Sequence, residues 1–189
     1  LGHNYTPFRG WRGGKGVIGM ETREGATEAE EGDFVEHLFT ATTHDYLMFF
    51  TATGRAYVEK VYEIPEMGRA AKGRSIANIL ELKPDEKIAA TIRVQSKKSG
   101  TGPTAVDQTW DENLDIGFAT QSGIVKKSNL SNYANVRRGG IIAIQIEEGD
   151  RLIDAKLTNG NNEIVLITKH GMSLRFHEEQ LRDQGRNTV

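Results

Sequence analysis

The sequence contains no cysteine and only four prolines among its 189 residues. The lack of cysteine excludes disulfides, thiolate chemistry and cysteine-ligated zinc sites. No stretch approaches the roughly 18 to 20 consecutive apolar residues of a membrane-spanning helix. The first residues also lack the charged-then-apolar pattern of a secretory signal. We therefore expect a soluble, cytoplasmic protein with no membrane partner.

A strong excess of one charge is also missing, yet charge is segregated along the chain. The formal net charge of −2 gives no global indication of nucleic-acid binding. Residues 21–40 nevertheless carry seven acids against Arg23 alone, whereas residues 122–140 carry four cations and no acid. Segregation of this kind indicates surfaces that can steer an anionic ligand, and it leaves open whether the acidic stretch 21–36 competes for the basic ones.

Glycine, in contrast, is abundant at 21 residues, and some of these glycines mark a repeat. Residues 32–54 and 149–171 align without gaps, each with a Gly-Asp turn, an apolar run, a threonine and a closing glycine. A third copy begins at residue 83 and is interrupted by the polar stretch 95–113, which we interpret as an inserted loop. A period of about 50 residues with four short strands per unit is typical of propeller-type blades.

The repeat predicts an all-β fold, an open array of about three to four blades. Alternating apolar residues predict strands over 76–82 and 142–146, and only residues 178–182 suggest a turn of helix. The expected units are a partial first blade with an acidic loop (1–31), a second blade (32–82), a third blade that carries the insert (83–148) and a partial fourth blade (149–189).

The stretch Arg12-Gly13-Gly14-Lys15-Gly16 is a candidate phosphate loop, but its spacing is wrong. The nucleotide-binding loop requires G-x-x-x-x-G-K followed by Ser or Thr, whereas Arg9 stands at the first glycine and Gly16 replaces the hydroxyl residue. No helix is expected after it to meet a phosphate. The five histidines lack metal-site spacing, so we predict neither nucleotide hydrolysis nor a metal site.

Turns rich in glycine and arginine recur at the same place in successive repeats. Glycine lets the backbone approach a ligand, and arginine and lysine neutralise phosphates, so such turns in register predict a basic rim that binds double-stranded DNA without reading its bases. The predicted contacts in the turns are Arg12, Gly13, Gly14, Lys15, Gly16, Arg69, Lys72, Arg74, Arg137, Arg138, Arg182 and Arg186. Further cations are expected beside them, namely Arg9, Arg55, Lys60, Lys126, Lys127, Lys169 and Arg175.

The glycine box and the blades together resemble the C-terminal domain of the DNA gyrase A subunit, in the type II topoisomerase family. The segments DFVEHLFTATTHDYLMFFTATGRAYVEKVYEIPE and GRAAKGRSIANIL are similar to that family throughout. The resemblance implies a six-bladed β-pinwheel, with this chain ending inside its fourth blade. It also implies DNA wrapping that supports ATP-dependent negative supercoiling. Five of the seven residues of the family's Q-R-R-G-G-K-G box match, with Gly10 and Trp11 in place of Gln and Arg.

The same resemblance implies partners and limits. The partners are DNA and, in an A2B2 holoenzyme associated with the nucleoid, the gyrase B subunit together with the rest of the A subunit. The family's catalytic tyrosine lies in another domain, so we expect no catalytic residue and no DNA cleavage by this chain alone. No cofactor is expected here, because ATP and Mg2+ belong to other parts of the holoenzyme. Three alternatives stay open: the equivalent domain of topoisomerase IV, a propeller that docks proteins, and a hydrolytic propeller enzyme.

Overall fold

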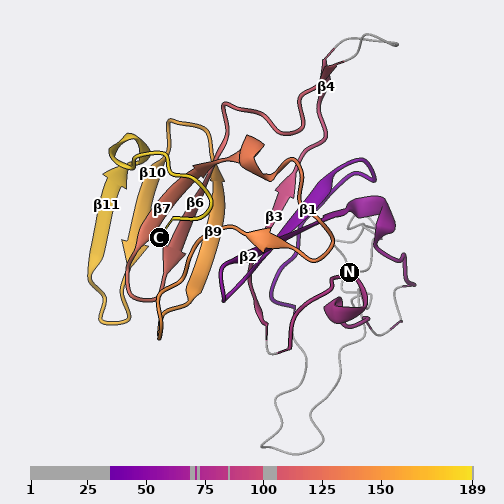
Figure 1. The fold of residues 1–189 in the computed structure, drawn as a ribbon, viewed down its shortest axis with the longest axis horizontal. Coiled ribbons are helices and arrows are strands. Elements are labelled where there is room, and N and C mark those ends of the chain that lie inside the picture. The colour runs from indigo at the N-terminus through magenta and orange to yellow at the C-terminus, as the bar shows by residue number, and fades with distance from the viewer. Residues whose placement is uncertain (1–34, 69–70, 72, 85, 100–105, 189) are drawn as a thin grey trace, which may run out of the picture.

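The computed structural model describes residues 35–68, 71, 73–84, 86–99 and 106–188, so the glycine box and most of the acidic stretch lie outside the described residues. Within these ranges the chain contains short strands and 3₁₀ turns and no α-helix, which confirms the expected all-β class. None of the helices found there is long and apolar enough to cross a membrane. Figure 1 shows two main groups of strands that lie next to each other along the longest axis.

The first sheet takes strands from separate stretches of the chain. Its central hairpin consists of β1 (Tyr46–Thr51) and β2 (Arg55–Lys60), which pair antiparallel. β3 (Ile88–Val94) pairs with β1 and β8 (Ile141–Ile142) pairs with β2, giving the order β3-β1-β2-β8. Because β3 and β8 follow the start of the next repeat, the repeats exchange strands instead of each closing its own sheet.

The second sheet repeats this plan. Its hairpin is β6 (Asp115–Thr120) with β7 (Val125–Asn129), and β9 (Leu152–Thr158) from the following repeat pairs with β6. The pairing β6–β9 thus corresponds to β1–β3 in the first sheet. Two further pairs are two-stranded, namely β4 (Lys98–Ser99) with β5 (Val106–Asp107), and β10 (Glu163–Ile167) with β11 (Ser173–His177).

Each of the three hairpins turns by the same local chemistry. Gly54, Gly123 and Gly171 have φ of +83°, +94° and +81°, a left-handed conformation that glycine adopts without steric cost. In each hairpin the hydroxyl of the threonine three residues earlier accepts a hydrogen bond from the amide just after the glycine, at 3.1, 3.2 and 3.2 Å. The repeated threonine and glycine of the sequence therefore encode one turn geometry.

Carboxylates from the following repeat bind the tips of the first two hairpins. Glu86 accepts hydrogen bonds from the Tyr57 hydroxyl (2.7 Å), the Thr53 hydroxyl (3.1 Å) and a backbone amide. Asp150 accepts from both the amide and the hydroxyl of Ser122. Burial alone would raise the pKa of Glu86, but these hydrogen bonds and the charge of Arg55 lower it overall. The two acids thereby connect successive repeats.

Aromatic side chains fill the space between the two sheets. Phe50 and Phe118, from the central strands of the two sheets, pack edge to face with ring centroids 5.2 Å apart, and Tyr133 contacts both rings. The opposite face of the first sheet packs in a second cluster that includes Leu47 and Leu80. Because both faces of β1 are buried, its sequence is apolar without alternation.

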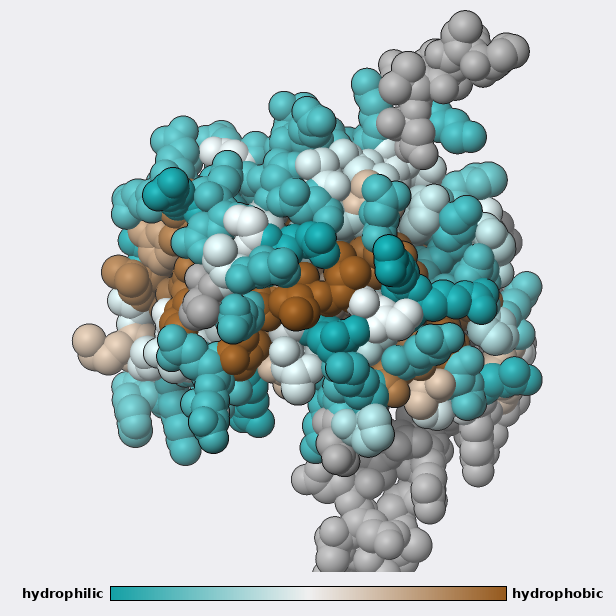
Figure 2. All heavy atoms as spheres, viewed as in Figure 1, coloured by the Kyte–Doolittle hydropathy of each residue, from teal (hydrophilic) through white to brown (hydrophobic). Residues whose placement is uncertain are grey.

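The pair β10–β11 is much more exposed than the two sheets. Four large apolar side chains of this hairpin and its turn are at least half exposed, namely Val165, Ile167, Met172 and Leu174. Figure 2 shows an apolar band across the middle of one face, and apolar side chains also reach the surface at the end where β10 and β11 lie. This pair has apolar residues like those of β1 but lacks described neighbours that cover them.

Two of the predicted strands are wrong. Residues 76–82 form the 3₁₀ turn η2 (Ile76–Asn78) and irregular chain, because Ser75 caps the turn and its apolar residues pack against the first sheet without pairing. In the stretch 142–146 the strand ends at Ile142. The chain then bends, since the amides of Ala143 and Ile144 both donate to the Gly54 carbonyl, at 2.9 and 3.2 Å.

The predicted turn of helix near residue 178 is confirmed as η5 (Glu178–Gln180). Equivalent turns follow the other hairpins, η1 (Val61–Glu63) after β2 and η4 (Leu130–Tyr133) after β7. The polar stretch 95–113 contains the pair β4–β5, and Figure 1 shows β4 projecting away from both sheets.

Candidate nucleic-acid interface

The basic turn that precedes β8 is well defined. Arg137 and Arg138 are exposed, and no described carboxylate lies within 4.0 Å of either guanidinium. Gly140 follows with φ of +70°, and its amide donates to the Arg137 carbonyl at 2.8 Å. A Cβ at position 140 would lie 2.8 Å from the ring of Tyr57, so glycine is required for the turn to rest on that ring. Two exposed arginines without a described carboxylate within 4.0 Å therefore stand on a closely packed turn.

Arg55 lies beneath this turn. Its Nη2 atom donates to the carbonyls of Gly139 and Gly140, the second at 3.1 Å. Its Nε atom lies 3.6 Å from a carboxylate oxygen of Glu86, and its guanidinium lies 5.9 Å from the centroid of the Tyr57 ring. The side chain is only 20% exposed. The structure thus places Arg55 as a support of the turn, whereas the sequence predicted a contact on the rim.

An acidic cavity adjoins Arg138. It has a volume of about 330 Å³ and is lined by Glu59, Glu63, Glu81 and Arg138 among other residues. Burial raises the pKa of Glu59 to about 7, helped by a hydrogen bond and negative charge from Glu63 and opposed by the charge of Arg138. Arg138 therefore faces carboxylates on one side and solvent on the other.

A second basic turn lies along β7, where Arg182 is exposed and Arg186 is half-buried. The Gln184 amide donates to the Lys127 carbonyl at 2.9 Å. The Asp183 carboxylate lies 3.1 Å from the ammonium of Lys127. The backbone of this turn is therefore fixed to the second sheet, while Arg182 is exposed and has no ion-pair partner among the described residues.

Lys126 is buried and does not present its charge to a ligand, which corrects the expectation from the sequence. The residue is 1% exposed. Its ammonium donates to the carbonyls of Ala143, Arg186 and Thr188 at 3.2, 2.9 and 2.9 Å. Burial lowers its pKa to about 8. Three acceptors satisfy all three donors of a lysine, so the group is used inside the fold.

Lys127 is also buried, at 8% exposure, and its ammonium lies 3.6 Å from Asp115 and 3.1 Å from Asp183. Both lysines were predicted as rim cations because they lie beside a basic turn in a segment, 122–140, that contains no acid. The acids that enclose Lys127 come from other segments, so the local sequence contains no sign of this burial.

The other predicted contacts are divided between the surface and the undescribed chain. Arg74, Lys169 and Arg175 are exposed, and Arg175 lies 3.4 Å from Glu163. Lys60 is half-buried over the rings of two tyrosines. Eight predicted residues lie outside the described residues, namely Arg9, Arg12, Gly13, Gly14, Lys15, Gly16, Arg69 and Lys72.

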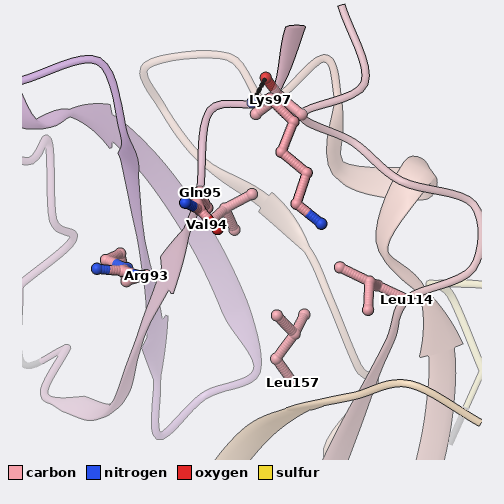
Figure 3. Close-up of a pocket in the computed structure, with 7 residues that line it drawn as sticks. Arg93, Val94, Gln95, Lys97, Leu114 and Leu157 are labelled. Carbon is pink, nitrogen blue, oxygen red and sulfur yellow. Dashed lines mark hydrogen bonds between the residues drawn. The ribbon is translucent and has the colours of Figure 1, made fainter. Parts of the chain in front are cut away.

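A small cavity between the sheets has two cations in its lining, Arg93 and Lys97. Its volume is about 160 Å³, below the roughly 300 Å³ at which small-molecule sites begin. Figure 3 shows Lys97 pointing toward Leu114, with Leu157 on the far side. The Lys97 ammonium lies 3.9 Å from Asp111. Within the described ranges no group of three or more acids or histidines is arranged to hold a metal.

Sequence reasoning missed the acidic and aromatic partners of the basic turns. Glu86, Glu59 and Tyr57 come from stretches distant from residue 137, so only the fold brings them near it. One signal was available, because an acid recurs near the start of successive repeats, as Glu86 and Asp150 do. Their role at the hairpin tips became apparent only from the hydrogen bonds.

Comparison with known proteins agrees with this architecture. The family model described as DNA gyrase C-terminal domain, beta-propeller, matches residues 12–42, 45–95, 118–159 and 162–189. The DNA gyrase A subunit of Halalkalibacterium halodurans is 42% identical over 94% of this chain, and that of Clostridium acetobutylicum is 38% identical over 94%. The chain spans 19% of the length of each of these relatives.

Solved structures share the fold. The C-terminal domain of DNA topoisomerase IV is similar with a TM-score of 0.65 and 29% identity, over 78% of this chain and 42% of that one. A DNA gyrase A C-terminal domain gives a TM-score of 0.58 over 78% of this chain and 42% of that one, and at 19% identity it supports the fold alone. The expected propeller-type, β-pinwheel architecture is thereby confirmed.

Proposed function

Because this chain belongs to the DNA gyrase C-terminal domain family, we propose that it binds double-stranded DNA and wraps it around exposed basic turns. The observation that carries the proposal is the turn 137–140. There two arginines without a described ion-pair partner stand on a glycine turn that packs against Tyr57. Arg182 adds a free cation on the corresponding turn of the next sheet.

The chemistry of these turns suits phosphate rather than bases. Arginine forms charge-assisted, often bidentate hydrogen bonds to phosphate oxygens. Such contacts fix the position of a duplex without carrying sequence information, so we expect binding that tolerates any sequence and weakens steeply with salt. Contacts on successive sheets would favour a bent duplex, because each added phosphate contact offsets part of the bending cost.

In this proposal the chain works within a gyrase A subunit, together with a gyrase B subunit, in ATP-dependent negative supercoiling in the cytoplasm. We favour gyrase over topoisomerase IV because the family model and the relatives near 40% identity are those of gyrase. We assign ATP, Mg2+ and DNA cleavage to other parts of that enzyme.

Binding is tested by measuring duplex affinity of the chain at several salt concentrations. We expect affinity to fall steeply between about 50 and 200 mM salt, and the double variant Arg137→Ala with Arg138→Ala to reduce the slope of log affinity against log salt by about 2. A matched double variant, Arg151→Ala with Lys156→Ala, removes two exposed cations outside the basic turns and should leave the slope nearly unchanged. Salt-insensitive binding, or equal effects of both double variants, would contradict the assignment.

Wrapping is tested separately from binding. Nicked circular DNA is ligated in the presence of the chain, and the trapped writhe is read from the distribution of topoisomers. We expect a shift of linking number with the natural chain and a smaller shift with the Arg137→Ala, Arg138→Ala variant at equal DNA occupancy. Binding without any shift of linking number would leave a DNA-binding module that does not wrap.

A further inference from the structure

Two cations that were expected on the basic rim instead donate hydrogen bonds within the fold. Each of them binds backbone carbonyls of a basic turn. Arg55 of β2 donates to the carbonyls of Gly139 and Gly140, next to Arg137 and Arg138. Lys126 of β7 donates to carbonyls beside and within the turn that carries Arg182 and Arg186. We call these two arrangements the carbonyl clamps.

The Arg55 clamp fixes the orientation of two successive peptide groups. A guanidinium is planar and rigid, so binding two neighbouring carbonyls restrains the rotation of the peptides between them. Glu86 holds the other side of the guanidinium, and the Tyr57 ring supports Gly140 from below. With its carbonyls held inward, the turn has its two arginine side chains on the exposed side.

The Lys126 clamp also restrains backbone carbonyls, but it uses an ammonium group in place of a guanidinium. Its ammonium donates to one carbonyl just after β8, that of Ala143, and to two in the C-terminal segment, those of Arg186 and Thr188. No carboxylate takes part, so the positive charge is stabilised by the carbonyl dipoles alone among the described residues. Tyr57 occupies the equivalent place in the first hairpin, three residues after the glycine.

We propose that Arg55 and Lys126 are positioning residues that hold the two basic turns in the orientation that phosphate contacts require. This inference rests on the proposed function. A turn that is already ordered loses less conformational freedom on binding, so removal of a clamp weakens DNA binding although the clamp itself touches no DNA.

The decisive experiment is a double-mutant cycle at the first clamp. Arg55→Lys keeps the charge, so a purely electrostatic attraction to phosphate would survive the change. The clamp would not, because a single ammonium nitrogen cannot take the places of both Nη2 on the two carbonyls and Nε beside Glu86. We expect Arg55→Lys to weaken duplex binding about threefold to tenfold and to lower the salt slope, as loss of the Arg137 and Arg138 contacts does. When Arg55→Lys is added to the Arg137→Ala, Arg138→Ala variant, duplex affinity should fall no further.

Arg93→Lys is the matched control. Arg93 also donates to a backbone carbonyl, that of Thr40, at 2.8 Å, and lies 3.9 Å from Asp45, but it supports neither basic turn. Arg93→Lys should leave DNA affinity and salt slope unchanged. Circular dichroism and thermal unfolding establish that each variant is folded at the temperature of the assay.

The second clamp is tested with Lys126→Met, which removes the donors from a residue that is 1% exposed. We expect a few-fold loss of affinity and faster hydrogen exchange of the amides in 184–188. When Arg182→Ala is added to Lys126→Met, DNA affinity should show no further loss. Full affinity in both clamp variants, or effects that add to those of the exposed arginines, would overturn the inference.

The design separates this inference from the proposed function. If Arg137→Ala with Arg138→Ala leaves binding unchanged, the basic turn is not a DNA contact and the proposed function fails at this site. If that variant weakens binding while Arg55→Lys and Lys126→Met do not, DNA binding stands and only the clamps are refuted.

Discussion

The hairpin β1–β2 and the hairpin β10–β11 share one turn but differ in almost everything around it. Both close on a glycine with φ near +80° and on a threonine hydroxyl that accepts the next amide. In the first hairpin Leu47 and Phe50 are fully buried, whereas in the third Val165 and Leu174 are 53% and 59% exposed. The turn is a property of a few neighbouring residues, while burial depends on which other strands are present.

The neighbours of the two hairpins explain the difference. β3 and β8 flank the first hairpin and the second sheet packs on one of its faces. In the described part of the chain, the sheet that contains β10 and β11 has only these two strands. A repeat in such an array is stabilised mainly through its interfaces with adjacent repeats. Similar sequences in the two hairpins should therefore respond very differently to the same substitution.

The largest contrast is expected for truncation of an apolar side chain. Phe50→Ala should lower the free energy of unfolding by about 3–5 kcal/mol, because it removes a buried ring that packs against Phe118 and leaves a cavity. Leu174→Ala, at an exposed site, should cost less than about 1 kcal/mol. Urea unfolding monitored by circular dichroism measures both. Similar losses for the two variants would mean that the third hairpin is covered in solution.

Replacement of the turn glycines sharpens the comparison at the level of the backbone. A Cβ at Gly54 would lie 2.2 Å from the Ile144 carbonyl oxygen, whereas a Cβ at Gly171 meets nothing within 4 Å. Both alanines suffer the left-handed strain of about 1–2 kcal/mol, so Gly171→Ala should cost about 1 kcal/mol and Gly54→Ala about 3 kcal/mol. Thermal unfolding of the two variants gives the difference. Equal costs would show that the contact at Gly54 relaxes freely.

The smallest effect concerns the carboxylate at the hairpin tip and depends on pH. The pKa of Glu86 is lowered in the fold, so its contribution to stability is present above the ordinary carboxyl pKa and is lost as pH falls through the lowered value. Glu86→Gln should cost about 1 kcal/mol at pH 7 and less at an acid pH low enough to protonate the carboxylate in the folded chain. The control Glu163→Gln, which removes an exposed ion pair with Arg175 on the third hairpin, should cost less than about 0.5 kcal/mol at either pH. Stability curves against pH that stay parallel for Glu86→Gln and the natural chain would contradict this role.

The sequence predicted those parts of the fold that depend on residues close together in the chain, and it failed where residues from distant segments interact. The hairpins, the glycine turns and the helical turn near 178 were predictable, because each rests on residues close in the chain. The strand expected over 76–82 was wrong, since apolar alternation there reflects packing against the first sheet and not pairing. The candidate site shows the same dependence on distant residues. Arg137 and Arg138 are exposed as predicted, whereas Lys126 is buried by contacts with a distant segment.

By itself the sequence determined the repeat, the strand-and-turn chemistry, the family resemblance and the set of cations available for phosphate. These depend on composition and short spacing, which a single chain displays directly. Only the tertiary structure decided which cations stand free and which are used internally. That choice arises when Gly139, Gly140, Arg186 and Thr188 approach the strands β2 and β7 from other repeats. Carbonyls that a neighbouring repeat covers in part need a donor, and two of the basic side chains supply it.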